Sequence, residues 1–323
     1  QSVKTLKTRH KLALTGTPIE NSLAELWSIF DFLMPQYLFN YHYFQKQYEN
    51  DIIKNNDEEK TKQLKKLVTP FILRRNKKEV LTELPDKIEQ NIILPFNDEE
   101  EKLYVANLAE ANKELQELYD LEGSDKMQIL KLLTRLRQLC LEPRLVYDNI
   151  DQPSSKLKAC MELIKTMQEN KQKVLLFSSF TSVLDLIAEE CQKAGITYYM
   201  LTGSTNKEDR RELVSRFQKD DTTVFLISLK AGGTGLNLTS AEAVIHFDPW
   251  WNVSAQNQAT DRAYRIGQKN NVQVFNLVMK DSVEEKIIEL QKRKKELADM
   301  FVENNSGGLS QMSKEDILSL FTM

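Results

Sequence analysis

The pattern of apolar and polar positions changes near residue 150, where the stretch YDNIDQPSSK brings Pro153 and two serines together. Before this point, apolar residues recur mostly at helical spacing, as they do from Leu23 to Leu33, where Pro35 then ends the helix. Helices are also predicted over residues 41–68, 97–119 and 125–141, with a buried strand end at 11–15 and a short strand at 91–96. The first part of the chain is therefore expected to be largely helical.

After residue 150, short apolar runs alternate with helical stretches. The runs predict strands at 173–179, 197–201, 223–228, 243–248 and 272–279, and the helices fall at 181–194, 207–219, 254–265 and 282–303. Strands that alternate with helices imply an α/β fold with a parallel sheet flanked by helices on both faces. In such a sheet the site lies at the carboxyl ends of the strands, so the loops after 179, 201, 228 and 248 are candidates.

Composition narrows the function classes. Hydrophobic residues make up 41% and charged residues 28%, as in a globular protein, and no apolar run is long enough to suggest a membrane partner. The cysteines Cys140, Cys160 and Cys191 are isolated, so neither a disulfide nor a metal site is predicted, and a reducing cytoplasm fits best. His246 ends the run AVIHF and is interpreted as a strand residue rather than a ligand or base.

Charge is uneven along the chain. The net charge of -3 excludes a chain that is cationic as a whole, so any nucleic-acid binding must come from local patches. Residues 60–78 contain eight Lys or Arg and no acid, directly after an acidic stretch. A solvated helix face and a binding patch both remain open for this run.

Three predicted strand-end loops carry candidate chemistry. The loop AGGTGLNL at 231–238 lets backbone N–H groups approach a ligand closely, although a tight turn would use the same glycines. LTGST at 201–205 offers hydroxyls to a phosphate backbone or, equally, to a helix N-cap. DPWWN at 248–252 has adjacent tryptophans that cannot both enter one core, so one is a candidate for ligand contact.

The segment QATDRAYRIGQ at 258–268 is the most informative stretch. At about 100° per residue, Gln258, Arg262 and Arg265 would share one stripe of a helix. Guanidiniums presented together suit the oxygens of a phosphate chain, because each is planar, permanently charged and bidentate. A surface ion pair between Asp261 and Arg265 is the alternative for this segment taken alone.

Taken together, these motifs resemble the Swi/Snf-type family of superfamily-two DNA translocases, and they come in that family's order. The matching segments are LTGTPIEN (14–21), LWSIFDFLMP (26–35), FILRRNKKEVLTELPDK (71–87), VLLFSSFTSVLDLI (174–187), LTGSTNKEDRRELVSRF (201–217), SLKAGGTGLNL (228–238), VIHFDPWWN (244–252) and QATDRAYRIGQ (258–268). The double tryptophan is more similar to the bacterial and archaeal branch. Val253 stands where the family usually has proline, which leaves the pose of Trp251 open.

The resemblance implies two RecA-like lobes, of which this chain contains mainly the second. The phosphate loop and the DExx box of the first lobe do not occur in the sequence, which looks like the C-terminal half of a longer enzyme. We expect residues 1–35 to end the first lobe, residues 36–150 to form a helical insertion and interlobe connector, residues 151–303 to form the second lobe, and residues 304–323 to form a flexible joint with a short helix.

The same resemblance implies roles for individual residues. Arg262 and Arg265 would be arginine fingers, and Gln258, Gly235 and Asn237 would lie near the nucleotide. The DNA backbone track would comprise Ser179, Gly203, Ser204, Thr205 and Lys230, with Trp251 touching the duplex. The residues expected to couple nucleotide state to DNA grip are Thr15, Gly16, Thr17, Arg74 and Arg75.

The implied function is that of the C-terminal motor lobe of an ATP-dependent double-stranded DNA translocase, a DNA-dependent ATPase. ATP would be shared with the missing N-terminal lobe, which would also hold Mg²⁺, and no metal ligands are expected in this chain. Double-stranded DNA, that N-terminal lobe and a DNA-bound protein complex are the expected partners. The alternative is an isolated DNA- or protein-binding module, and we expect this fragment alone to be inactive.

Overall fold

The computed structural model describes residues 8–14, 23–55, 57–73, 81, 84–120, 126–232 and 236–301. These residues divide into two compact units. Within the described residues, the first unit takes in Gln1–Val80, Trp251–Ser254 and Gln291–Ser313, and the second takes in Leu81–Trp250 and Ala255–Leu290. Each unit is described by itself below.

The first unit is mainly helical where it is described. Its elements are α1 (Leu23–Leu33), α2 (Tyr41–Phe44), the π-helix η2 (Gln45–Glu49), α3 (Asn50–Asn55), α4 (Glu58–Val68) and the 3-10 helix η3 (Thr69–Phe71). Asn40 and Asp57 cap the N-termini of α2 and α4 with their side chains. Leu26, Phe30 and Phe44 are buried together in one apolar cluster, so the helical spacing found in the sequence does mark the core face.

The strand end predicted at residues 11–15 is wrong for its described part. Residues 11–14 form no strand, and Leu12 and Leu14 are 80% and 90% exposed. A strand needs a hydrogen-bonding neighbour, and no sheet occurs among the described residues of this unit. The basic helix α4 exposes Lys65 and Lys66 to solvent and pairs Lys62 with Glu58 at its surface.

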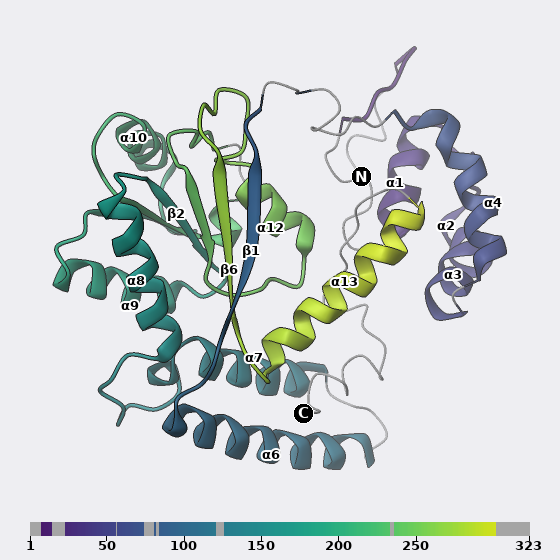
Figure 1. Ribbon diagram of the computed structural model, residues 1–323. Helices are drawn as coiled ribbons and strands as arrows, with labels where there is room; N and C mark the ends of the chain where they lie inside the picture. The colour runs from purple at the N-terminus through teal and green to yellow at the C-terminus, as the bar shows by residue number, and fades with distance from the viewer. Residues whose placement is uncertain are drawn as a thin grey trace. The chain divides into compact units, whose positions relative to one another are not determined.

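The second unit is built on a six-stranded parallel sheet with the order β1-β6-β5-β2-β4-β3 (Figure 1). The strands are β1 (Lys87–Leu94), β2 (Val174–Ser178), β3 (Tyr198–Leu201), β4 (Val224–Ser228), β5 (Ala243–His246) and β6 (Val272–Met279). Every residue of β2, β4 and β5 is buried, which explains why these strands appear in the sequence as unbroken apolar runs.

Helices cover both faces of this sheet. The helices that lie wholly or partly in the unit are α6 (Asp98–Asp120), α7 (Lys126–Leu141), α8 (Ser155–Glu169), α9 (Thr181–Lys193), α10 (Lys207–Phe217), α11 (Leu229–Gly232), α12 (Val253–Thr260) and α13 (Val283–Phe301), with the 3-10 helix η4 (Pro143–Leu145) after α7. One apolar cluster joins α8 and α9 to the face that carries Leu176 and Ile245. A second cluster joins α10 and α12 to the face that carries Leu175 and Val244. The expected α/β class, with a helical region before the sheet, is confirmed.

Strand β1 extends the sheet with residues that precede α6 and α7. It pairs in parallel along its whole length with β6, from Lys87 opposite Val272 to Leu94 opposite Met279. It begins four residues earlier than the strand expected at 91–96. Only some of its side chains are shielded from solvent, so the sequence of β1 lacks the apolar run that marks the central strands.

Candidate nucleotide and DNA site

The loops that carry the predicted site residues meet at one edge of the sheet. Because all strands are parallel, β2, β3, β4 and β5 end at the same edge, which we call the carboxyl edge. Ser178 at the end of β2 lies directly opposite Ser228 at the end of β4. The hydroxyl of Ser228 is buried without a hydrogen-bond partner in the part of the chain that the structure describes.

The segment that carries Arg262 and Arg265 is not a continuous helix. Helix α12 ends at Thr260, five residues earlier than predicted, so the two arginines lie in the turns that follow rather than on one helical stripe with Gln258. The Arg262 N–H donates to the Ala259 carbonyl, which tightens the chain, and the Arg262 carbonyl accepts from the Leu238 N–H at 3.0 Å. If α12 were longer, the Arg262 carbonyl would accept a hydrogen bond within the helix, but here it bonds to another loop instead.

Both arginines are nevertheless directed to the Gly-rich loop at 231–238. Arg262 Nε donates to the Gly232 carbonyl at 3.0 Å, and Arg265 Nη1 donates to the Leu236 carbonyl at 3.4 Å. Arg262 is half-buried, whereas Arg265 is exposed. Burial, aided by the neighbouring charge of Arg265, lowers the pKa of Arg262. The structure therefore holds two like charges close together, an arrangement that an anion would stabilise.

Two further carbonyls of the Gly-rich loop accept hydrogen bonds from α10 and from the segment that follows it. Arg210 Nη1 donates to the Ala231 carbonyl at 3.3 Å, and Gln218 Nε2 donates to the Asn237 carbonyl at 2.6 Å. A Cβ at Gly232 would lie 2.9 Å from the Phe177 ring, so this position accepts only glycine without a shift in the core. Lys230 and Asn237 are exposed here, and Gly235 lies outside the described residues.

The loop after β3 presents its polar groups to solvent. Gly203 and Ser204 are exposed and Thr205 is half-buried. The Thr205 hydroxyl accepts from the Thr202 N–H at 3.1 Å, which closes the turn. Asn206, rather than LTGST, supplies the side-chain N-cap of α10, so the capping alternative for this motif is wrong.

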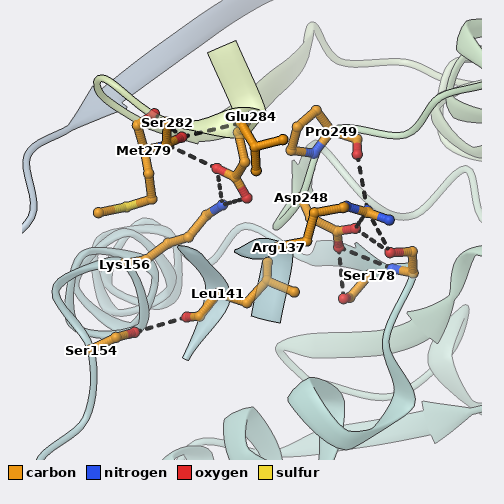
Figure 2. A network of polar contacts seen from close by, with 12 residues as sticks. Arg137, Leu141, Ser154, Lys156, Ser178, Asp248, Pro249, Met279, Ser282 and Glu284 are labelled. Atoms are coloured by element: carbon orange, nitrogen blue, oxygen red, sulfur yellow. Dashed lines mark hydrogen bonds and ion pairs between the residues drawn. The ribbon is translucent and has the colours of Figure 1, made fainter. Parts of the chain in front are cut away.

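A buried polar network that sequence reasoning missed lies behind the loops after β2 and β5 (Figure 2). Asp248 accepts from the Ser178 hydroxyl at 2.7 Å and from the Ser179 N–H at 3.0 Å. The Ser179 hydroxyl also donates to Asp248. Arg137 of α7 forms an ion pair with Asp248 at 2.9 Å, and the two side chains are only 9% and 1% exposed. Ser179, predicted to line the DNA track, is therefore part of this network.

The two tryptophans of DPWWN differ in burial. Trp251 is 9% exposed, whereas Trp250 is half-buried and packs against the cluster shared by α10 and α12. The side-chain carbonyl of Gln256 accepts from the Trp250 N–H at 3.2 Å. The Gln256 amide in turn donates to Asn276 of β6 at 3.0 Å. The start of α12 thus fixes the loop to the sheet.

Gln268, at the end of the arginine segment, is buried and ties the segment to its surroundings. Its amide donates to the Ala241 carbonyl at 2.8 Å and to the Ala263 carbonyl at 3.3 Å. Its side-chain oxygen accepts from the N–H groups of Lys269 and Asn270. This one side chain therefore anchors the turns that carry both arginines.

His246 behaves as the strand residue that the sequence predicts. It ends β5, is buried, and pairs its Nε2 with the Thr260 hydroxyl at 2.8 Å, at the point where α12 ends. Burial lowers its pKa to about 4.

Some predictions lie outside the described residues: those for Thr15, Gly16, Thr17, Arg74, Arg75 and Gly235, and that for the segment 304–323. Gln258 is half-buried on α12. Over the ranges described, no cluster of three or more His, Cys, Asp or Glu side chains could hold a metal ion. None of the helices in those ranges is both long and apolar enough to cross a membrane.

Comparison with known proteins adds independent evidence. Residues 1–145 match the model of the SNF2-related domain, and residues 155–267 match that of the helicase conserved C-terminal domain. An uncharacterized ATP-dependent helicase of Mycoplasma pneumoniae is 39% identical over 99% of this chain and 30% of its own length. The ISWI chromatin-remodeling complex ATPase ISW1 of Saccharomyces cerevisiae is 33% identical over 99% of this chain and 30% of its own. The chain spans about a third of the length of the curated relatives it matches.

A solved structure covers nearly the whole chain. The SWI2/SNF2 ATPase core of Sulfolobus solfataricus in complex with dsDNA is 34% identical, with a TM-score of 0.60 over 99% of this chain and 68% of that one. Sequence motifs, sheet topology and this similarity agree, and they show that the chain belongs to the SWI2/SNF2 family of ATP-dependent helicase and translocase motors.

Proposed function

We propose that this chain is the C-terminal motor lobe of an ATP-dependent double-stranded DNA translocase. The observation that carries the proposal is the pair Arg262 and Arg265, which contact the Gly-rich loop at the carboxyl edge of the second unit. Ligands bind at this edge in open parallel sheets. The family match supplies the chemical context for the pair.

The residues at this edge fit a nucleoside triphosphate. Arg262 and Arg265 supply two cations for phosphate oxygens, and Gln258, Gly235 and Asn237 belong to the same two motifs. ATP supplies the phosphoanhydride bond whose cleavage drives the cycle. The chain's arginines neutralise charge on the phosphates, a contribution typically worth about 10³- to 10⁵-fold in rate for an arginine finger. We assign the remaining phosphate contacts and Mg²⁺ to an N-terminal lobe of the same protein.

The proposed DNA track follows the loops after β2, β3 and β4. Three exposed residues of these loops suit phosphate contacts. Lys230 supplies a positive charge, Ser204 supplies a hydroxyl, and Gly203 is small enough to allow close approach. Thr205 and Ser179 are half-buried and Trp251 is buried, and we assign these three to the track on the family resemblance. A relative crystallised in complex with dsDNA supports the choice of a duplex as the ligand.

We assign the coupling between nucleotide state and DNA binding to two motifs that precede β1 in the chain. Thr15, Gly16 and Thr17 would signal from the end of the first lobe (residues 1–35), and Arg74 and Arg75 would act in the connector (36–150). A DNA-bound protein complex is a further proposed target, since one relative is named as a chromatin-remodeling ATPase.

The test is ATP hydrolysis and movement by the full-length protein. We expect duplex DNA to stimulate hydrolysis and a DNA-bound roadblock protein to be displaced only when ATP is hydrolysed. A fixed ATPase rate with and without DNA would reject the translocase. The rival function, a binding module without catalysis, predicts DNA or protein binding with no ATPase activity in the full-length protein.

A further inference from the structure

One guanidinium in the second unit bridges the ends of two neighbouring strands. Arg137 comes from α7, yet its Nη2 donates to Ser179 at 3.0 Å, after β2, and to Asp248 at 2.9 Å, after β5. It also donates to the Pro249 carbonyl at 3.3 Å. Figure 2 shows Arg137 reaching the Asp248–Pro249 turn. A helix outside the sheet therefore holds both loops at once.

Aromatic rings complete the enclosure. The Arg137 guanidinium lies 5.0 Å from the centre of the Phe180 ring and 5.8 Å from that of the Trp250 ring. A guanidinium can stack flat on rings while several N–H groups donate in its plane, whereas a lysine ammonium is a compact tetrahedral donor that cannot stack in this way. These contacts suit the planar shape of arginine as well as its positive charge.

The conformation of the loop after β5 depends on this cation. Asp248 is buried and accepts from Ser178, Ser179 and Arg137, so its carboxylate defines where the chain turns before the two tryptophans. Without Arg137, the Asp248 carboxylate would be a buried charge without its cation, which costs free energy unless its surroundings change. The donors around it would then rearrange, and the conformation of the loop that carries Trp250 and Trp251 would no longer be held.

We propose that Arg137 is a positioning residue that holds the DPWWN loop in the conformation through which duplex DNA stimulates ATP hydrolysis. The inference rests on the proposed function, because it concerns how DNA engagement at this loop reaches the nucleotide. It gives α7, which lies between β1 and β2 in the chain, a specific task, since this helix would set the shape of a loop that we assign to the DNA track.

A second buried ion pair in the same unit provides a matched control. Lys156 of α8 donates to both carboxylate oxygens of Glu284 at 2.6 and 2.7 Å, and both side chains are fully buried. This pair fastens α8 to the start of α13, whereas the hydrogen bonds of Arg137 go to the loops of the carboxyl edge. Lys156→Gln and Arg137→Gln both remove one buried cation, but only the second removes the contact with Asp248.

The experiment measures ATPase rates of the full-length protein with and without duplex DNA for wild type, Arg137→Gln, Arg137→Lys and Lys156→Gln. We expect Arg137→Gln to keep its DNA-free rate and to lose stimulation on the order of 10- to 100-fold, as misplacement remote from the chemistry can cause. Arg137→Lys should show a partial loss. Lys156→Gln should keep its stimulation ratio at temperatures where it is folded.

The possible results distinguish the positioning role of Arg137 from the proposed function of the protein. If wild type is stimulated by DNA and Arg137→Gln shows the same stimulation ratio as Lys156→Gln, the positioning role is wrong and the proposed function stands. If wild type shows no stimulation, the proposed function fails and the inference fails with it. If Arg137→Gln does not fold, Arg137→Lys decides: full stimulation in that variant would overturn the need for a planar, stacking cation.

Discussion

At the scale of single residues, the site is defined by which backbone carbonyls its cations touch. Arg262 and Arg265 donate hydrogen bonds to carbonyls of the Gly-rich loop. In the other direction, the Leu238 N–H of that loop donates to the Arg262 carbonyl. Each of the two motifs therefore fixes the other. We therefore expect a displacement of one segment to displace the other, which suits the nucleotide site that we propose.

Lys230 provides a test of the proposed DNA track. It is exposed beside the Gly-rich loop, where its charge can meet a phosphate without desolvation. Replacing it with alanine should weaken DNA binding uniformly across sequences and reduce the slope of log K against log salt by about 1. Fluorescence anisotropy at several salt concentrations measures that slope. Lys193, on α9 and paired with Glu190, is the control, and an equal change of slope in Lys193→Ala would contradict the assignment.

His246 predicts a pH dependence of stability. Its folded-state pKa of about 4 lies below the ordinary 6.5, so the unfolded chain takes up a proton more readily than the folded protein. The stability tied to this group is complete above about pH 6.5, and lowering the pH towards 4 should remove about 3 kcal/mol of it. Urea unfolding of wild type and His246→Gln at several pH values measures this effect. A gap in unfolding free energy that stays constant from pH 7 to pH 4 would contradict it.

At the scale of elements, the central strands were predictable and the end of α12 was not. Strands β2, β4 and β5 are buried on every residue, so an unbroken apolar run marks each of them. In contrast, the residues after Thr260 are ordinary helix formers, and their intrinsic preference favours a longer helix. Tertiary contacts override it, because the Arg262 carbonyl bonds to Leu238 and the Gln268 side chain holds Ala263.

The role of Arg137 was missed although the sequence held a signal for it. The buried residues of α7 include Ile129, Leu133 and Leu136, at helical spacing, and Arg137 lies on the same stripe. A charged residue on a core-facing stripe indicates a buried partner, since an unpaired charge there is costly. Sequence alone could not identify Asp248 as that partner, because 111 residues separate the two and only the folded sheet brings them together.

The buried pair Lys156–Glu284 leads to a stability prediction. Lys156→Gln leaves Glu284 as a buried carboxylate without its cation, which should reduce the free energy of unfolding by about 3–5 kcal/mol. The double variant Lys156→Gln/Glu284→Gln removes the stranded charge, and its amide oxygen can still accept from the Met279 N–H. Urea unfolding should therefore show partial recovery in the double variant. A double variant that is less stable than Lys156→Gln would contradict this account of the pair.

At the scale of the whole molecule, we propose that ATP hydrolysis needs residues beyond those of this chain. The motifs of the sequence resemble those of a second motor lobe, and the sequence contains no GxxxxGK[ST] phosphate loop. The matches to the SNF2-related domain and to the helicase conserved C-terminal domain support a motor of this family. Catalysis is therefore a property that we assign to the full-length protein.

The isolated chain, residues 1–323, should consequently bind DNA only weakly and should not turn over ATP. We expect its DNA affinity to fall steeply between low and physiological salt, because the contacts of one lobe are mainly to phosphates. A coupled ATPase assay with duplex DNA at low salt, run beside the full-length protein, checks this. Hydrolysis by the isolated chain at a rate comparable to that of the full-length protein would refute a shared site.

The most direct test of the central claim is the ATPase rate of full-length Arg262→Ala with saturating duplex DNA. The account predicts a rate lower by about 10³- to 10⁵-fold, with DNA affinity kept, because the guanidinium is assigned to the phosphates and not to the DNA. Arg216→Ala, which removes an exposed arginine paired with Glu212 on α10, should retain the wild-type rate. Wild-type hydrolysis by Arg262→Ala would contradict the account.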